Sequence, residues 1–564
     1  MSIQSNPAKH TLLEGSRRAH RPGAQVLGRA DPHEWAEITL KLRRKSPLPE
    51  PVRGQAVLTQ EAAAADYGAD PADIEKVATA LEGYGLTILS KDPVTRTVKA
   101  AGAVDRMEAI FQTHLLRVKH GDVLYRGRVG NLSVPAELAG LIQGVFGLDT
   151  RPMIRRRGKA RPIAPQAQLP PPNQRPWFLP QELAEAYGFP GHDGAGQSIG
   201  VIELGGSYIA SDLTAFAQIT GLGAAPPVSV VNVNMLSASD ANNPDAIGEV
   251  MLDTEVVAAV CPGAKDIVLY FAPFTEKGWV DVIDAALSDT IHHPAVLSIS
   301  YGLAEGSLNG DIWTQAAMDA VNDSMQEAAA RGIPVCVAAG DDGSDDQVGD
   351  GQAHVNFPAS SPYVLAVGGT ALVKSASGTT EKVWFDGDGL RADGGGSTGG
   401  GVSAVFPKPT WQAEIDIPSV NPGAIAGRII PDVSADAAGS TGYFMVSSGQ
   451  PQVSGGTSAA TPLWAALIAR LLEAGAPIGY LTPIFYEAAP DGSGDTVGLE
   501  TCNDITQGNN DTAAAGGYSA GPGFDAVTGW GSPKGAALAR LLPQTSATAT
   551  APTPGPKVPV ETHH

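Results

Sequence analysis

The chain has 564 residues, of which 43% are hydrophobic, so it is long enough for two to four ordinary domains and can bury a substantial core. Its formal charge of −21 at pH 7 argues against nucleic acid and anionic membranes as partners, and no apolar run reaches the ~18 residues of a membrane-spanning helix. Residues 1–20 lack the apolar segment of a secretory signal. The cysteines Cys261, Cys336 and Cys502 form no CxxC pair, so we expect buried thiols rather than a disulfide framework.

The charge is distributed unevenly along the chain. Residues 1–161 hold 25 Lys and Arg against 17 Asp and Glu, a charge of +8, whereas the remaining residues hold 13 against 42, a charge of −29. Opposite charges on two covalently joined parts favour docking of one part onto the other. We therefore expect the first part to bind the second by electrostatic attraction.

Residues 36–150 show strand and helix signals in alternation. The segment DPADIEKVATALEGYG opens on Asp and Pro and ends on Gly, as a capped helix does, and EITLKLRR alternates apolar and polar residues, as a strand does. In chain order we expect a strand at 37–44, a helix at 70–85, strands at 86–92 and 95–102, a helix at 103–113, a hairpin at 114–130 and a last helix at 135–148. This order predicts a small α+β domain of the ferredoxin-like kind.

Residues 151–176, RPMIRRRGKARPIAPQAQLPPPNQRP, are rich in Pro and Arg and have no apolar periodicity. Such a composition predicts an extended, exposed connector. Two interpretations fit it equally: a connector that is cleaved, and a solvated spacer between two domains.

From residue 177 to residue 542 the pattern changes to short apolar strands separated by helices. Continuous apolar runs lie at 198–204, 266–272, 295–301 and 333–340, and helical segments lie between them at 249–261, 278–289 and 314–332. Such alternation predicts an α/β domain with a doubly wound, mainly parallel sheet, whose active site lies at the carboxyl ends of the strands. Residues 543–564 have low complexity, so we expect a disordered tail.

The stretch GGTSAATP at 455–462 places Ser458 behind two glycines and in front of an apolar run with helical spacing. Glycines allow a tight turn there, so the serine hydroxyl can act as a nucleophile if a base takes its proton. Of the eleven histidines, only His354 lies in the interior of the second region outside polar turns, and a structural role fits it better than a catalytic one. A Ser–His–Asp triad is therefore poorly supported.

Carboxylates offer an alternative base. Glu249 and Asp253 are four residues apart, so they share one helix face with residues that are otherwise apolar. Two acids in a partly desolvated position are expected to share a proton. A solvated acidic helix end explains the same spacing at least as well, since helix N-termini favour anions.

Two further acids accompany strand ends. Asp341 comes directly after the run 333–340, and Glu203 lies near the end of the run 198–204, so both are expected at the carboxyl edge of the predicted sheet. Capping of a turn is the routine explanation for each.

Together these stretches resemble the sedolisins, or serine-carboxyl peptidases, and most closely their kumamolisin-like members. GGTSAATP resembles the nucleophile motif of the subtilisin-like fold, VCVAAGDDG carries Asp341 where subtilisins have an oxyanion-hole Asn, and IGVIELGG carries Glu203 where they have the triad Asp. The helix with Glu249 and Asp253 stands in place of their His-Gly-Thr motif. The resemblance covers most of residues 30–542 and implies a subtilisin-like catalytic domain preceded by a propeptide.

The resemblance implies a role for each residue. Ser458 would be the nucleophile and Glu249 the general base, with Asp253 orienting Glu249 and Glu203 extending their hydrogen-bonded chain. Asp341 would be protonated and would donate to the oxyanion beside the backbone N–H of Ser458, so activity would be lost when that proton leaves. A carboxylate base also suits acid conditions better than neutral ones.

One motif departs from the family pattern. Where the family has a strand of the SISWGG type, this chain reads SISYGL, so Tyr301 replaces a Trp near the acid pair and Leu303 replaces a glycine. The hydrogen bonds around the acids and the adjacent wall of the substrate site therefore do not transfer directly from the family.

A later segment, CNDITQGNND…YSAGPGFDAVTGWGSP, resembles the calcium loop of the family. The implied ligands are the carboxylates of Asp504 and Asp525 and the backbone carbonyls of Ile505, Gly521 and Gly523, which suit a hard, oxygen-seeking cation such as Ca²⁺. Without the resemblance, the segment reads as an Asx-turn loop.

The sequence thus predicts an acid-active serine endopeptidase made as a zymogen. Residues 1–150 would be an inhibitory and chaperone prodomain, 151–176 would contain the processing site, and 177–542 would cleave polypeptides through an acyl-enzyme on Ser458. The alternatives are an exopeptidase on the same fold and a catalytically silent, calcium-stabilised binding protein. The family implies an extracellular monomer that binds its own prodomain.

Overall fold

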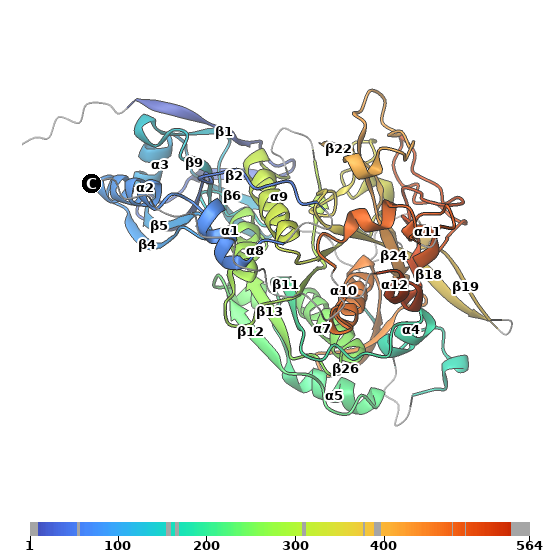
Figure 1. Ribbon diagram of the computed structural model, residues 1–564. Coiled ribbons are helices and arrows are strands. Elements are labelled where there is room, and N and C mark those ends of the chain that lie inside the picture. The colour runs from blue at the N-terminus through green and yellow to red at the C-terminus, as the bar shows by residue number, and fades with distance from the viewer. Residues whose placement is uncertain are drawn as a thin grey trace, which may run out of the picture.

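The structure is a computed structural model of the chain. It describes residues 9–52, 57–153, 160–163, 169–306, 312–375, 378–387, 396–476, 478–490 and 492–542. Figure 1 shows an N-terminal domain packed against a larger domain in which helices surround a central sheet. In the described part of the chain, no helix is long and apolar enough to cross a membrane. The tail predicted at 543–564 and two parts of 151–176 lie outside the described residues.

The N-terminal domain is built on a four-stranded antiparallel sheet with the order β4-β5-β3-β9. The chain passes through β3 (Trp35–Leu42), α2 (Pro71–Gly83), β4 (Thr87–Asp92), β5 (Thr97–Ala103), α3 (Val104–Phe111) and β9 (Ile142–Phe146). This βαββαβ order is a ferredoxin-like arrangement, the class expected from the sequence, although its last element is a strand where a helix was expected. Around it lie α1 (Gln60–Tyr67), the pair of β1 (His10–Arg18) and β8 (Gly130–Pro135), and a sheet of β2 (Gln25–Arg29), β6 (Leu116–His120) and β7 (Val123–Gly127).

The prediction of a last helix at 135–148 is wrong. Five residues of that segment, Ile142–Phe146, form the strand β9, which pairs with β3, and a short 3-10 turn at Ala136–Leu138 precedes them. Glycines explain the difference, because Gly140 and Gly147 adopt φ angles of 76° and 99°, which an α-helix does not contain. Pairing with β3 then satisfies the backbone groups of this segment.

The larger domain contains an eight-stranded sheet with the order β12-β13-β11-β14-β16-β18-β19, in which β24 also pairs with β18. The pairs are parallel except for the antiparallel edge strand β19. The strands are β11 (Ser198–Leu204), β12 (Val228–Asn232), β13 (Asp266–Ala272), β14 (Val296–Ile299), β16 (Val335–Ala338), β18 (Leu365–Ser375), β19 (Gly378–Val383) and β24 (Val433–Asp436). The bounds of β11 and β13 match the predicted apolar runs residue for residue.

Both faces of this sheet are buried, as a doubly wound fold requires. Residues of β13 alternate between two cores: Ile267 and Leu269 pack with α7 (Pro244–Val260) and α10 (Thr457–Glu473), whereas Val268 and Tyr270 pack with α8 (Glu276–Ser288) and α9 (Gln315–Ala330). The remaining elements are α4 (Pro180–Ala186), α5 (Ala210–Thr220), α6 (Ala238–Ala241), α11 (Val497–Thr501), α12 (Gly535–Leu541), β10 (Arg161–Pro162), β15 (Leu303–Ala304), β17 (Asn356–Phe357), β20 (Phe385–Gly387), β21 (Gly396–Ser397), β22 (Gly401–Pro407), β23 (Gly427–Ile430), β25 (Tyr443–Ser447), β26 (Gln450–Ser454), β27 (Cys502–Asn503) and β28 (Ser532–Pro533).

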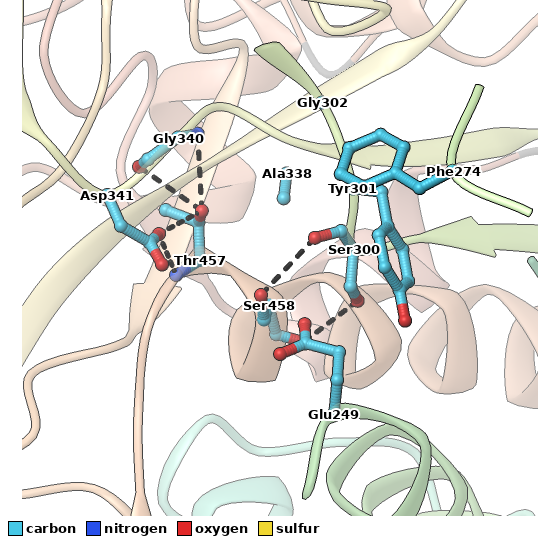
Figure 2. A pocket seen from close by; sticks show the side chains of 10 residues that line it. All are labelled: Glu249, Phe274, Ser300, Tyr301, Gly302, Ala338, Gly340, Asp341, Thr457 and Ser458. Atoms are coloured by element: carbon cyan, nitrogen blue, oxygen red, sulfur yellow. Dashed lines mark hydrogen bonds between the residues drawn. The ribbon is translucent and has the colours of Figure 1, made fainter. Parts of the chain in front are cut away.

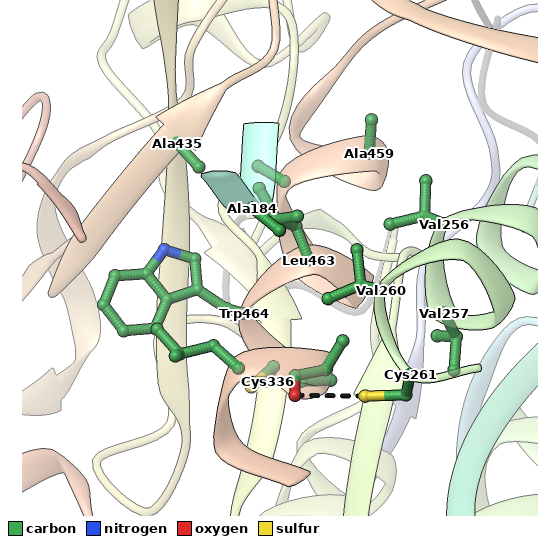
Figure 3. Packing of buried hydrophobic residues seen from close by; sticks show 14 of the residues in the cluster. Ala184, Val256, Val257, Val260, Cys261, Cys336, Ala435, Ala459, Leu463 and Trp464 are labelled. Carbon is green, nitrogen blue, oxygen red and sulfur yellow. Dashed lines mark hydrogen bonds between the residues drawn. The ribbon is translucent and has the colours of Figure 1, made fainter. Parts of the chain in front are cut away.

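Helices α7 and α10 pack against each other, and they carry the predicted base and nucleophile. Figure 3 shows Val260 of α7 beside Leu463 of α10, and both side chains are fully buried. Cys261, which ends α7, donates a hydrogen bond from Sγ to the carbonyl oxygen of Ala466 at 3.3 Å. Burial raises the pKa of the Cys261 thiol to about 12, and the other two cysteines are also buried and unbridged. The prediction of three core thiols is confirmed.

The N-terminal domain contacts the larger domain through ion pairs on α8, α9 and the chain next to them. Basic side chains come from the N-terminal domain and carboxylates from the larger domain: Arg18–Glu276, Lys41–Asp284, Arg44–Asp323, Arg44–Glu327 and Arg96–Asp323. The Lys41 and Arg96 side chains are each only 2% exposed. The opposite charges of the two parts of the chain therefore meet at a largely dehydrated interface.

Two neighbouring carboxyl groups of the larger domain, the fully buried Asp436 and the half-buried Glu381, accept hydrogen bonds from hydroxyl groups. Glu381 of β19 accepts a hydrogen bond from the Tyr187 hydroxyl at 2.7 Å, and Asp436 of β24 accepts one from the Thr441 hydroxyl at 2.7 Å. Burial, reinforced by the negative charges of Glu381 and Asp386, raises the pKa of Asp436 to about 8. Burial also raises the pKa of Glu381. Burial therefore favours the neutral form of Asp436 below pH 8 and shifts the pKa of Glu381 in the same direction.

Asp436→Asn is expected to flatten the pH dependence of stability. Because the pKa of Asp436 is higher in the folded protein than the unfolded value near 4, its contribution is complete below pH ~4 and is lost as the pH rises through 8. Between pH 5 and 8 the variant, which resembles the neutral acid, should lose about 3–4 kcal/mol less unfolding free energy than the parent. Urea unfolding at both pH values measures this difference. Asp416→Asn, at an exposed position, is the control, and parallel pH profiles for Asp436→Asn and the parent would contradict the prediction.

Candidate active site

Helix α7 carries the two predicted acids into the interior. Asn243 caps its N-terminus, since its side chain accepts hydrogen bonds from the N–H groups of Asp245 and Ala246. Asp253 is fully buried, and Glu249, one turn nearer the N-terminus, is half-buried and lines a pocket. The pair thus lies on the inner face of the helix and not on a solvated helix end.

Ser458 lies in the first turn of α10. The turn before it needs glycine, because Gly456 has a φ of +100° and a Cβ at this position would lie 2.6 Å from Asp341 Oδ2. The serine is 6% exposed, and its Oγ donates a hydrogen bond to the carbonyl oxygen of Ser300 at 3.3 Å. In Figure 2, Glu249 extends from α7 toward Ser458. The glycine turn therefore presents the serine hydroxyl to the side on which the acid of α7 lies.

Asp341 follows β16 and lies against the N-terminus of α10. Its Oδ1 accepts hydrogen bonds from the backbone N–H of Thr457 at 2.7 Å and from the Thr457 hydroxyl at 2.5 Å. The first N–H groups of a helix have no acceptor within the helix, and the helix dipole favours an oxygen acceptor at this end. Asp341 is therefore held by Thr457, the residue that directly precedes Ser458.

Glu203 and Tyr301 lie behind the pocket. Glu203 is fully buried near the end of β11, and its Oε2 accepts a hydrogen bond from the Tyr301 hydroxyl at 2.9 Å. Tyr301 follows β14 closely and is itself 3% exposed. The residue that departs from the family motif therefore supplies a hydroxyl donor to one of the predicted acids.

One pocket brings most of these residues together (Figure 2). It is lined by Glu249, Phe274, Ser300, Tyr301, Gly302, Ala338, Gly340, Asp341, Thr457 and Ser458. The strand-end residues among them follow β13, β14 and β16, whose carboxyl ends meet at one edge of the sheet, as expected for this fold. Of the predicted residues, Glu249, Asp341 and Ser458 line the pocket, whereas Asp253 and Glu203 are buried outside its lining.

Several residues of the pocket were not predicted, and three of them carry side chains that face the chemistry or the wall: Phe274, Ser300 and Thr457. Phe274 and Ser300 each come within two residues after a parallel strand, and Thr457 directly precedes the serine. The sequence could have identified Phe274 and Ser300 from their positions, because the residues that follow parallel strands form the site in such folds.

None of the described residues that line the pocket is a histidine. The Nε2 atom of His354 instead lies 2.9 Å from the carboxylate of Asp350, four residues away. The structural role expected for His354 fits this contact, and the pocket offers carboxylates in place of an imidazole.

The predicted calcium ligands converge on one turn. Asp525 Oδ2 accepts a hydrogen bond from the N–H of Gly521, and Asp504 Oδ2 accepts one from the N–H of Gly523, both at 3.1 Å. Among the described residues, no three His, Cys, Asp or Glu side chains form a group that could hold a metal ion. Two carboxylates facing one turn fit a cation only if backbone carbonyls, such as that of Ile505, complete the oxygen ligands.

Comparisons with known proteins identify the family of this chain. The family model described as Pro-kumamolisin, activation domain, matches residues 32–151, and that of the Subtilase family matches residues 235–486. The chain is 43% identical to kumamolisin from Bacillus sp. (strain MN-32), over 95% of this chain and 97% of that protein. It is 30% identical to tripeptidyl-peptidase sed5 from Aspergillus fumigatus, over 93% of this chain and 96% of that protein.

A solved structure shows the same relationship. Pseudomonas sedolisin, a serine-carboxyl proteinase complexed with pseudo-iodotyrostatin, matches with a TM-score of 0.55 and 30% identity, over 64% of this chain and 97% of that chain. The fold, the pocket with a serine between carboxylates and these similarities lead to one conclusion. The chain belongs to the sedolisin family of serine-type peptidases, as a kumamolisin-like member with an N-terminal propeptide.

Proposed function

We propose that this peptidase is an acid-active endopeptidase that hydrolyses peptide bonds through an acyl-enzyme on Ser458. The observation that carries the proposal is the pocket in which Ser458, Glu249 and Asp341 lie together without a histidine in its described lining. A serine hydroxyl needs a base. Asp341 is bound to Thr457 through Oδ1, so Glu249 is the carboxylate best placed to accept the proton.

In this mechanism Glu249 removes the proton from Ser458 Oγ as that oxygen attacks the scissile carbonyl carbon, and then gives the proton to the leaving amine. Asp253, one turn further along α7, orients Glu249 from the protein interior, and Glu203 supports this chain of acids. The burial of both supporting acids, at 0% exposure, is the observation that supports an orienting role, because solvent cannot exchange for their partners.

Asp341 acts as a protonated oxyanion donor. In this role Oδ2 is the oxygen that would carry the proton, because Oδ1 already accepts two hydrogen bonds from Thr457. Oδ2–H then donates to the developing oxyanion beside the backbone N–H of Ser458, which has no acceptor within the helix. This donor exists only while Asp341 is protonated, and the enzyme is therefore active in acid.

Ser458→Ala tests this proposal on the full chain. After a shift to pH ~4, the parent should shorten, and N-terminal sequencing and mass analysis should place its new N-terminus within 151–176. The Ser458→Ala chain should keep its full mass and should not hydrolyse casein. Casein hydrolysis by Ser458→Ala at the parent rate would refute the assignment of the nucleophile, and an inactive parent would favour a catalytically silent binding protein.

The prodomain is proposed to block the site until the connector is cut. Two contacts support this: the N–H of Met153 donates to the carbonyl oxygen of Phe274 in the pocket wall at 2.8 Å, and Arg161 pairs with Val453 of β26, shortly before Ser458. The described ends of the connector thus contact the catalytic domain on either side of residues 154–159, which lie outside the described residues.

Exopeptidase activity is the alternative within the same family, because several relatives bear the name tripeptidyl-peptidase. Peptides of graded length with blocked N-termini separate the two activities. An endopeptidase cleaves blocked peptides internally, whereas a tripeptidyl-peptidase requires a free N-terminus and releases fragments of constant length.

We also propose that the enzyme acts outside the cell, since a zymogen opened by acid is suited to an acidic exterior. We propose that it acts there as a monomer.

Ca²⁺ is proposed to bind Asp504, Asp525 and the carbonyls of Ile505, Gly521 and Gly523, where it stabilises the loop. We expect 1 mM Ca²⁺ to raise the melting temperature by about 5–10 °C over chelated protein, because a ligand that binds only the folded state stabilises it. Asp525→Asn should abolish the shift, whereas Asp511→Asn, at an exposed position of the same region, should retain it. Scanning calorimetry measures both, and an equal shift in the two variants would place the cation elsewhere.

A further inference from the structure

Helix α10 contains a proline four residues after the predicted nucleophile. In an α-helix the carbonyl oxygen of residue i accepts a hydrogen bond from the N–H of residue i+4. The residue four positions after Ser458 is Pro462, which has no N–H. The carbonyl of Ser458 therefore lacks its normal donor, in the turn that has to hold the nucleophile still.

Ser300 fills this gap from the neighbouring strand. It directly follows β14, and its Oγ donates a hydrogen bond to the carbonyl oxygen of Ser458 at 3.2 Å. In return, Ser458 Oγ donates to the carbonyl oxygen of Ser300 at 3.3 Å. Figure 2 shows these two reciprocal hydrogen bonds side by side at the edge of the pocket. The two serines are 158 residues apart in the chain.

We propose that Ser300 is a positioning residue for the nucleophile: its hydroxyl replaces the helix donor that Pro462 removes and so fixes the backbone of Ser458. The inference rests on the proposed role of Ser458. This one hydrogen bond affects two groups, because the position of the Ser458 backbone sets the position of both Oγ and the N–H that faces the oxyanion.

The reciprocal bond defines a resting position for the nucleophile. With Oγ–H directed to the Ser300 carbonyl, the proton is not yet directed to Glu249, so a rotation of the Ser458 hydroxyl has to precede the proton transfer. The Ser300 hydroxyl keeps the backbone fixed during this rotation, since it binds the carbonyl and not Oγ. Loss of that hydroxyl should therefore disturb the chemical step more than substrate binding.

The test compares Ser300→Ala with Ser300→Thr in the acid-activated enzyme. We expect Ser300→Ala to lower kcat by about 10- to 100-fold while KM changes by less than about twofold. Ser300→Thr keeps a hydroxyl and should restore kcat to within about threefold of the parent. A parent-like kcat in Ser300→Ala, or equal losses in the Ala and Thr variants, would overturn the proposal.

A double-mutant cycle with Pro462→Ala tests the compensation itself. The Pro462→Ala substitution returns an N–H to the helix, so the loss caused by Ser300→Ala should be at least about threefold smaller in this background. Equal losses in both backgrounds would show that the hydroxyl does not replace the helix donor. If Pro462→Ala does not fold, the comparison of Ser300→Ala with Ser300→Thr still decides. Ser458→Ala separates the two claims: activity in that variant contradicts the proposed nucleophile, whereas an inactive Ser458→Ala with a fully active Ser300→Ala contradicts only this inference.

Discussion

Glu249→Gln should lower kcat for peptide hydrolysis at pH 4 by about 10³-fold, because the amide preserves the size of the side chain but cannot accept a proton. KM should change little, since Glu249 acts on the reacting hydroxyl. Stopped-assay kinetics on a chromogenic peptide measure both constants. Glu414→Gln, at an exposed position with no role in the pocket, is the matched control and should keep the parent values.

Chemical rescue makes the same prediction sharper. In Glu249→Ala the half-buried site loses its carboxylate and gains a space next to Ser458, so added formate should restore part of the rate in proportion to its concentration. Formate should not affect the Glu414→Gln control. Full activity in Glu249→Gln would contradict the role of Glu249 as base. A Glu249→Ala variant that keeps the parent kcat and does not respond to formate would contradict it as well.

The second large effect concerns the prodomain interface. Asp323 of α9 binds two guanidinium groups of the prodomain, those of Arg44 and Arg96. Burial alone would raise the pKa of Asp323, but Arg96 and Arg44 outweigh burial and hold its pKa below its usual range. Its contribution to docking is therefore present above pH ~4 and is lost as the pH falls through the depressed pKa. Acid loosens this contact by protonating the carboxylate.

Asp323→Asn should weaken docking of the prodomain at pH 6 by about 2 kcal/mol, or about 30-fold, because the nearly buried Arg96 loses its charged partner. The full-length variant should then convert to the shorter form faster than the parent between pH 4 and 6, where Asp323 of the parent keeps its charge. Gel time courses over this pH range measure the shift. Asp319→Asn changes an exposed acid one turn earlier on the same helix and should convert like the parent. Identical pH dependence in Asp323→Asn and the parent would contradict the account.

The sequence predicted those parts of the fold and site that depend on local pattern. The apolar runs defined β11 and β13 to the residue, and the spacing of Glu249 and Asp253 placed both acids on one helix face. The helix predicted at 135–148 failed because pairing with β3 and two glycines with positive φ outweigh the local helix signal. Charge asymmetry predicted docking of the two parts, but the individual ion pairs depend on how the folded domains meet.

The rest of the site depends on contacts between distant segments. Thr457 binds Asp341 across 116 residues, and Ser300 binds Ser458 across 158. The spacing of residues within one segment does not predict these contacts, because they form only where the ends of β14 and β16 meet the first turn of α10. Tyr301 shows the same limit: the sequence identified it as a departure from the family, whereas its hydrogen bond to Glu203 is visible only in the folded chain.

The central claim is that Ser458 carries the acyl group during catalysis at acid pH. The most direct measurement is mass spectrometry of the activated enzyme after mixing with a peptide ester at pH 4 and quenching in acid within the first turnover. The account predicts that the acyl mass is found on the peptide that contains Ser458, and that it is absent in Ser458→Ala and strongly reduced in Glu249→Gln. An acyl group on another residue, or undiminished turnover by Ser458→Ala, would contradict the account.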